Sequence, residues 1–127
     1  MSANPRTLRW GLAIAGGVVA EAGVFAVMPV ALALGPDAPL YAIPPAAFLM
    51  PFVMAMVVAR QTASGRVLHG GIVGAVAALI YIAITIGQTL PVAYIVSHVL
   101  KVAGGMAGGL IVDRRVKRTT SAHAAMV

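Results

Sequence analysis

Four long apolar stretches dominate this sequence, and they constrain its fold more than any other feature. The stretches run over residues 10–34, 40–59, 67–86 and 91–112, with approximate boundaries. An α-helix rises 1.5 Å per residue, so about 20 apolar residues cross a hydrocarbon core of about 30 Å. Each stretch is therefore long enough to form one transmembrane helix. We predict an all-α protein, an integral membrane four-helix bundle.

The composition agrees with a membrane protein of one domain. Of the 127 residues, 61% are hydrophobic and 9% are charged, and the mean hydropathy is +0.98. Soluble domains carry roughly 25% charged residues. Because no segment between the spans is long enough to fold alone, we expect one transmembrane domain over 1–118, followed by a disordered cytoplasmic tail over 119–127. The absence of cysteine excludes disulfides, Fe–S clusters and thiolate metal sites.

The basic residues predict the orientation of the bundle. The loops at 35–39 and 87–91 contain no Lys or Arg. Cytoplasmic loops carry an excess of Lys and Arg, so we expect both termini to be cytoplasmic, in a bacterial inner (plasma) membrane that the chain crosses several times. The basic run that follows the fourth span, residues 113–118, resembles a segment that anchors to anionic lipid. Such a run more often only flanks the end of a span, and we favour that interpretation. All Lys and Arg except Lys101 lie on the predicted cytoplasmic side, at Arg6, Arg9, Arg60, Arg66, Arg114, Arg115, Lys117 and Arg118.

Two charged residues fall deep in the predicted spans. Glu21 is eleven residues past Trp10, roughly 16 Å from the cytoplasmic end of its helix. Lys101 is twelve residues before Asp113, roughly 18 Å from the same surface. An isolated charge at the bilayer centre costs at least about 2.5–3.5 kcal/mol, so each residue needs a partner. We predict that Glu21 and Lys101 pair.

Two further polar residues complete a candidate membrane-embedded site. His98 precedes Lys101 by one helical turn, and Ser97 borders the same face. One interpretation is a buried ion pair that fixes the register of the helices, with His98 as a hydrogen-bonding neighbour. The other is a proton-coupled or substrate site. We expect no metal or cofactor, since His98 would need a ligand from a second chain to hold a haem.

Small residues at helical spacing indicate where helices approach closely. A glycine every fourth residue lets two helix backbones come together in lipid. The second span also contains Pro44, Pro45 and Pro51, so this helix should be bent or should begin near Pro45. We expect the following glycines to be helix-packing residues: Gly17, Gly70, Gly74, Gly104, Gly105, Gly108 and Gly109.

Three segments resemble uncharacterised small four-span bacterial membrane proteins. These segments are residues 57–60 (VVAR), 65–74 (GRVLHGGIVG) and 104–109 (GGMAGG), and the resemblance covers about half of the chain. It implies an architecture and no activity. Small multidrug transporters are similar in length and carry a glutamate in their first span, which Glu21 matches. They surround that glutamate with Trp and Tyr and do not place a lysine opposite it.

No sequence motif points to an enzyme. The chain lacks G-x-S-x-G, H-E-x-x-H and P-loop sequences, and no basic cluster is interleaved with aromatic residues as in nucleic-acid-binding proteins. We expect a non-enzymatic accessory or structural protein that packs against partner helices, as a homo-oligomer or in a larger membrane complex. The alternative is a small dimeric proton-coupled transporter that uses Glu21.

Overall fold

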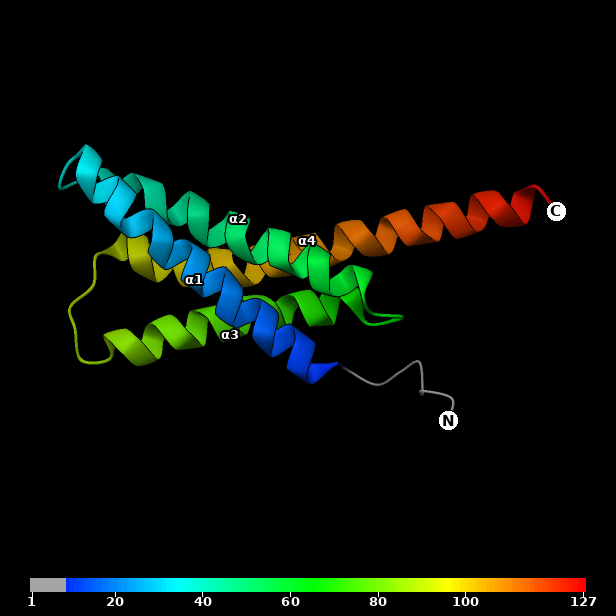
Figure 1. The fold of residues 1–127 in the computed structure, drawn as a ribbon, viewed down its shortest axis with the longest axis horizontal. Helices are drawn as coiled ribbons and strands as arrows, with labels where there is room; N and C mark the ends of the chain where they lie inside the picture. The colour runs from blue at the N-terminus through cyan, green and yellow to red at the C-terminus, as the bar shows by residue number, and fades with distance from the viewer. Residues whose placement is uncertain (1–8) are drawn as a thin grey trace.

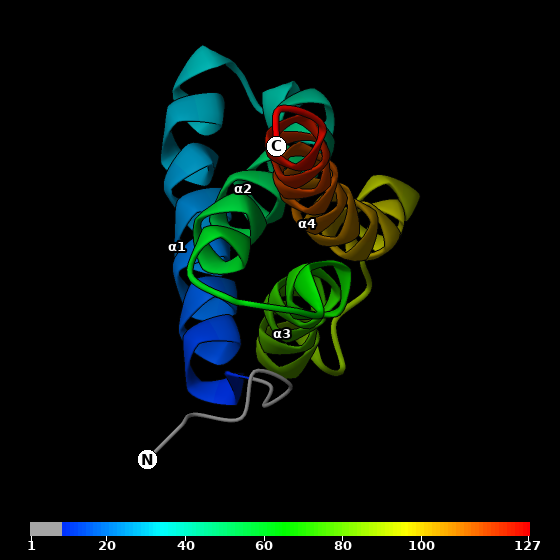
Figure 2. The same ribbon diagram turned by 90° about the vertical axis from the view of Figure 1, so that its right-hand side faces the viewer.

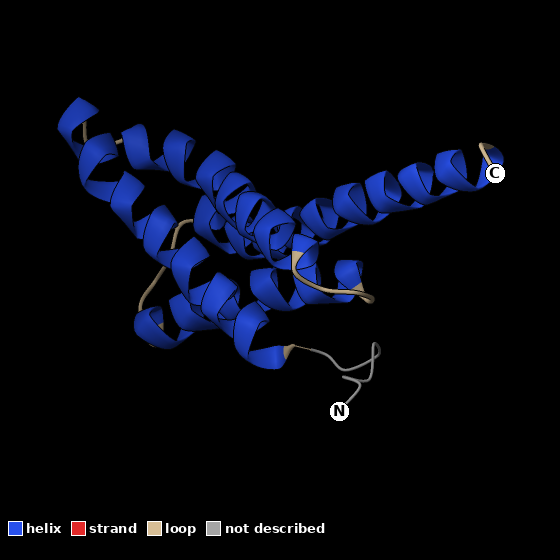
Figure 3. Ribbon diagram, turned by 45° about the vertical axis from the view of Figure 1, so that its right-hand side comes forward, coloured by secondary structure: helices blue, strands red, loops and turns tan. Residues whose placement is uncertain are grey.

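The computed structural model describes residues 9–127 and is all-α (Figure 1). Its helices are α1 (Trp10–Leu34), α2 (Ala38–Arg60), α3 (Arg66–Thr85) and α4 (Val92–Ala125). The described residues include no β-strand (Figure 3). Each helix is long and apolar enough to cross a membrane. The prediction of an all-α four-helix bundle, with helices long and apolar enough to span a membrane, is confirmed. Arg6, one of the residues used to predict the orientation, lies outside the described residues.

The helix boundaries follow the four apolar stretches, with one clear exception at the C-terminus. Instead of ending near Val112, α4 continues to Ala125 and projects beyond the bundle (Figure 1). The segment contains no Gly or Pro to stop the helix. Lys117 reaches back to Asp113, and the Thr119 hydroxyl donates to the Arg115 carbonyl oxygen at 3.1 Å. The expected disorder of residues 119–127 is therefore wrong for the helical part, up to Ala125.

The prolines of the second span lie inside a continuous helix. Pro44, Pro45 and Pro51 all fall within α2, which begins at Ala38 with Pro39 in its first turn. Proline is well tolerated in the first turn, where its missing N–H has no intrahelical partner in any case. The alternative that this helix begins near Pro45 is wrong, because the helix starts earlier and runs through both prolines.

The loops sort to the two ends of the bundle. The start of α1, the α2–α3 loop and the projecting part of α4 lie at one end, and the α1–α2 and α3–α4 loops lie at the other (Figure 1). Gly65 closes the α2–α3 loop with a φ of 64°, and Gly87 follows α3 with a φ of 81°. These left-handed backbone conformations favour glycine. The described basic residues that flank the helices therefore lie together at the end that holds the start of α1, the α2–α3 loop and the projecting part of α4.

The four helices do not form a square. Helices α2 and α3 contact each other and both outer helices, so α1 and α4 lie on opposite sides of the α2–α3 pair (Figure 2). Within the described residues, no Cα atom of α1 comes within 8 Å of a Cα atom of α4. The apolar core between α1, α2 and α3 is built from small and β-branched side chains: Ala13, Ala20, Ala55, Val58, Val73 and Ala77.

Candidate functional site

Glu21 and Lys101 form an ion pair in the interior of the bundle. The Lys101 Nζ atom lies 2.9 Å from Glu21 Oε1 and donates a hydrogen bond to it. The same Nζ atom lies 2.7 Å from Oε2, in an orientation that makes an ionic contact without a well-directed hydrogen bond. Each side chain is only 2% exposed. The two charges are therefore closed off from the surroundings and neutralise each other.

This pair connects the two helices that do not otherwise pack together. Glu21 comes from α1 and Lys101 from α4, and the lysine side chain spans the gap between their backbones. Lys101 can enter the bundle because its carbonyl lies directly against Gly74 of α3, where a Cβ atom would collide with it. The glycine thus brings α4 close to α3 at the level of the charge.

Tyr81 is a third member of the site. The face of its ring points at the Lys101 ammonium group, whose Nζ atom lies 4.5 Å from the ring centroid. A desolvated cation over an aromatic face is stabilised by about 2 kcal/mol or more. We did not predict Tyr81 as a site residue from the sequence. Tyr81 is fifteen residues past Arg66, roughly 22 Å along its helix, so the depth count that paired the charges could have placed it nearby.

His98 borders the pair without bonding to it. Its ring packs against Tyr81 with 5.3 Å between centroids, and its buried Nδ1 atom has no hydrogen-bond partner among the described residues. His98 also lines an apolar groove of about 460 Å³ on the outer side of α3 and α4. Ser97 is buried, but its hydroxyl donates to the Ala93 carbonyl oxygen of its own helix at 2.8 Å. Ser97 therefore has no polar contact with the pair.

The predicted packing glycines lie at contacts between helices of this chain. Gly70 and Gly105 face each other so closely that a Cβ atom on either would collide with the other's carbonyl oxygen. Gly104 and Gly108 lie in the same way against carbonyl oxygens of α2, Gly109 lies against α3, and Gly17 lies against Val76. The helices of this chain therefore pack against one another through these glycines.

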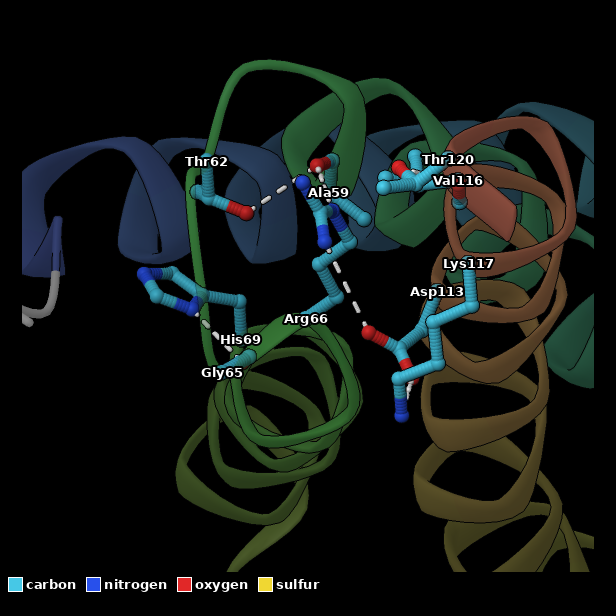
Figure 4. A network of polar contacts seen from close by, with 9 residues as sticks. All are labelled: Ala59, Thr62, Gly65, Arg66, His69, Asp113, Val116, Lys117 and Thr120. Carbon is cyan, nitrogen blue, oxygen red and sulfur yellow. Dashed lines mark hydrogen bonds and ion pairs between the residues drawn. The ribbon is translucent and has the colours of Figure 1, made fainter. Parts of the chain in front are cut away.

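A separate polar network ties the ends of the helices together. Arg66 at the start of α3 lies 3.5 Å from Asp113 of α4 and donates to the Ala59 carbonyl oxygen at the end of α2 (Figure 4). Lys117 holds the other Asp113 oxygen at 2.8 Å. The hydrogen bond from Lys117, reinforced by Arg66, lowers the pKa of the Asp113 carboxyl. The network therefore contributes stability at neutral pH that is lost as the pH falls through that lowered pKa.

His69 belongs to this end of the bundle and is buried. It is 2% exposed, its Nδ1 lies 2.8 Å from the Gly65 carbonyl oxygen, and its Nε2 accepts the Arg9 backbone N–H at 3.0 Å. A ring that donates at one nitrogen and accepts at the other is a neutral imidazole. His69 therefore fastens the start of α1 to α3.

Comparison with known proteins supplies no relative for this chain. No protein-family model, curated protein or solved structure matches it. Among the described residues, no group of three or more His, Asp or Glu side chains is placed to hold a metal ion. The geometry of the Glu21–Lys101 pair and its surroundings is therefore the basis on which a function can be proposed.

Proposed function

We propose that this protein is a small non-enzymatic component of a bacterial inner membrane, with an accessory or structural role beside partner helices. The observation that carries the proposal is the closed ion pair of Glu21 and Lys101. A group that couples proton movement to transport must reach water or substrate, but these side chains are each 2% exposed and bonded to each other. A buried pair of this kind is suited to selecting one arrangement of helices.

The packing glycines refine this proposal. Because α2 and α3 already cover Gly104, Gly105, Gly108 and Gly109, a partner must use other faces of the bundle. A bulky residue at Gly104 or Gly108 would collide with an α2 carbonyl. Such a change is therefore expected to unfold the chain itself before it affects assembly, and it is not a clean test of partner binding.

The decisive experiment is purification of the native protein in a mild detergent, followed by identification of what elutes with it. We expect a larger membrane protein in fixed stoichiometry, and we expect the Glu21→Gln variant to elute with the same partner. Glutamine keeps a carbonyl oxygen that can accept from Lys101, so the variant should remain folded. Elution of the wild-type chain without any other protein would contradict the accessory role.

A dimeric proton-coupled transporter is the second candidate. It is favoured by the succession of polar side chains from Glu21 and Lys101 through Tyr81 to His98, which lines the apolar groove. Such a transporter would show pH-dependent ligand binding in reconstituted vesicles, and that binding would vanish in Glu21→Gln. Binding that persists in the variant would leave the structural role as the better explanation.

A further inference from the structure

The part of α4 that leaves the apolar span is an exposed basic helix. It projects past the other helices (Figure 1), and Arg114, Arg115 and Arg118 are all exposed on it. These residues follow directly after Val112, which is buried in the bundle. The basic segment is thus held in a fixed position relative to the membrane-spanning helices by the continuity of α4.

The arginines gather on one side of this helix. At about 100° per residue, Ile111, Arg114, Arg115 and Arg118 share an arc about 100° wide, and Asp113 falls on the other side. The four residues line a hollow of about 220 Å³. The helix therefore presents three guanidinium groups and one apolar side chain around a common space.

No carboxylate of the described chain neutralises these arginines. The sequence contains three acidic residues. Glu21 is bound to Lys101, Asp113 is bound to Arg66 and Lys117, and Asp37 precedes α2 at the opposite end of the bundle. Within the described residues, Arg114, Arg115 and Arg118 make no ion pair. Their positive charge is left for an anion from outside the chain.

The depths of Arg114 and Arg115 fall within the headgroup layer of a bilayer, and Arg118 lies at its outer edge. With a rise of 1.5 Å per residue, Arg114 to Arg118 lie about 3–9 Å beyond Val112 along the helix axis. The polar layer of one leaflet is about 5–8 Å thick, because the whole bilayer measures about 40–45 Å and its core about 30 Å. Ile111 is one turn before Arg114 and Arg115 and two turns before Arg118, on the side of Val112 that faces the apolar span.

We propose that Ile111, Arg114, Arg115 and Arg118 form a binding site for the phosphate headgroup of an anionic phospholipid. The planar guanidinium group pairs with phosphate oxygens through two parallel hydrogen bonds, and three such groups surround the hollow. Ile111 provides an apolar contact below the phosphate, where a phospholipid carries its acyl chains. A free phosphate or a soluble anion has no counterpart to this contact. The site is independent of the role proposed for Glu21 and Lys101.

Two neighbouring residues allow a matched test. Arg118 lines the hollow, whereas Lys117 points to Asp113 at 2.8 Å, so Arg118→Gln and Lys117→Gln remove the same charge at nearly the same depth. Phosphatidylglycerol would be titrated into the full chain in detergent micelles that contain phosphatidylcholine, and the bound lipid counted by native mass spectrometry. We expect Arg118→Gln to weaken phosphatidylglycerol binding about five-fold, the equivalent of about 1 kcal/mol per basic residue. Lys117→Gln should change it less than two-fold.

The outcomes separate a site from a general attraction between charges. Equal weakening by the two variants would show a diffuse electrostatic field and would overturn the proposal, as would unchanged binding in Arg118→Gln. Inorganic phosphate at the same concentration should not displace the lipid; full displacement would show a free-anion site instead. The Arg118 side chain, like that of Lys117, is exposed. The thermal midpoint of Arg118→Gln without phosphatidylglycerol should therefore equal that of the wild-type chain, which shows that weaker lipid binding does not come from a loss of folding.

Discussion

At the scale of residues, the contact between Glu21 and Lys101 follows from depth and cost alone. Both charges lie near the middle of their spans, and neither is stable alone in hydrocarbon. The count of residues from the basic end could therefore predict that they meet. The same count could place Tyr81 at a nearby depth. It could not predict that the ring faces the ammonium group with 4.5 Å between Lys101 Nζ and the ring centroid, because the rotation of α3 is set by packing with its neighbours. The same limit explains why the bonds of His69 were missed.

A pair of adjacent glycines tests the closest helix contact at this scale. A methyl group on Gly70 would collide with the Gly105 backbone, which cannot move without shifting α4. On Gly71 it would meet only the flexible Met106 side chain, at 3.3 Å. We expect Gly70→Ala to destabilise the protein by about 3 kcal/mol, as overpacking does. Gly71→Ala should be neutral or slightly stabilising, because alanine favours a helix.

Thermal unfolding in detergent would measure both alanine variants. The two changes add the same methyl group at neighbouring positions of one helix, so the difference between them reports the environment of each glycine. Equal midpoints for Gly70→Ala and Gly71→Ala would mean that α3 and α4 do not approach as closely as the structure places them.

At the scale of elements, the lengths of the apolar stretches predicted the helices well, but the polar composition of the C-terminal tail led to a wrong prediction of disorder. The four spans were predictable because about 20 apolar residues have one stable structure in lipid. The tail after Val112 was predicted to be disordered because it is polar. It is helical to Ala125, since good helix formers and local bonds such as Lys117–Asp113 can extend a helix that is already nucleated. The glycines indicated close packing without identifying which helices they join.

At the scale of the whole molecule, the fold places the basic helix ends together at one end of the bundle (Figure 1). The excess of Lys and Arg in cytoplasmic segments predicts that this end faces the cytoplasm. The role of the protein could not be predicted to the same degree. A buried ion pair is compatible with a structural tie and with a coupling site, and the sequence does not state how well the pair is closed from its surroundings.

Reporter fusions at residues 38, 63, 89 and 125 test this orientation. They should read outside, inside, outside and inside, with alkaline phosphatase active only at the outside positions. The fusions at residues 38 and 89, in or next to the loops without Lys or Arg, serve as controls for the fusions at residues 63 and 125, which lie near the basic residues. A fusion at residue 125 that reads outside would contradict a cytoplasmic C-terminus.

The ion pair that joins α1 to α4 is tested most directly by a double-mutant cycle on thermal stability in detergent. Glu21→Leu and Lys101→Leu should each cost about 3–5 kcal/mol, because each leaves a buried charge without its partner. The double variant should lose less than the sum of the two single losses, since neither charge is then stranded. Strictly additive losses would contradict the pairing of Glu21 with Lys101, and with it the structural role proposed for the pair.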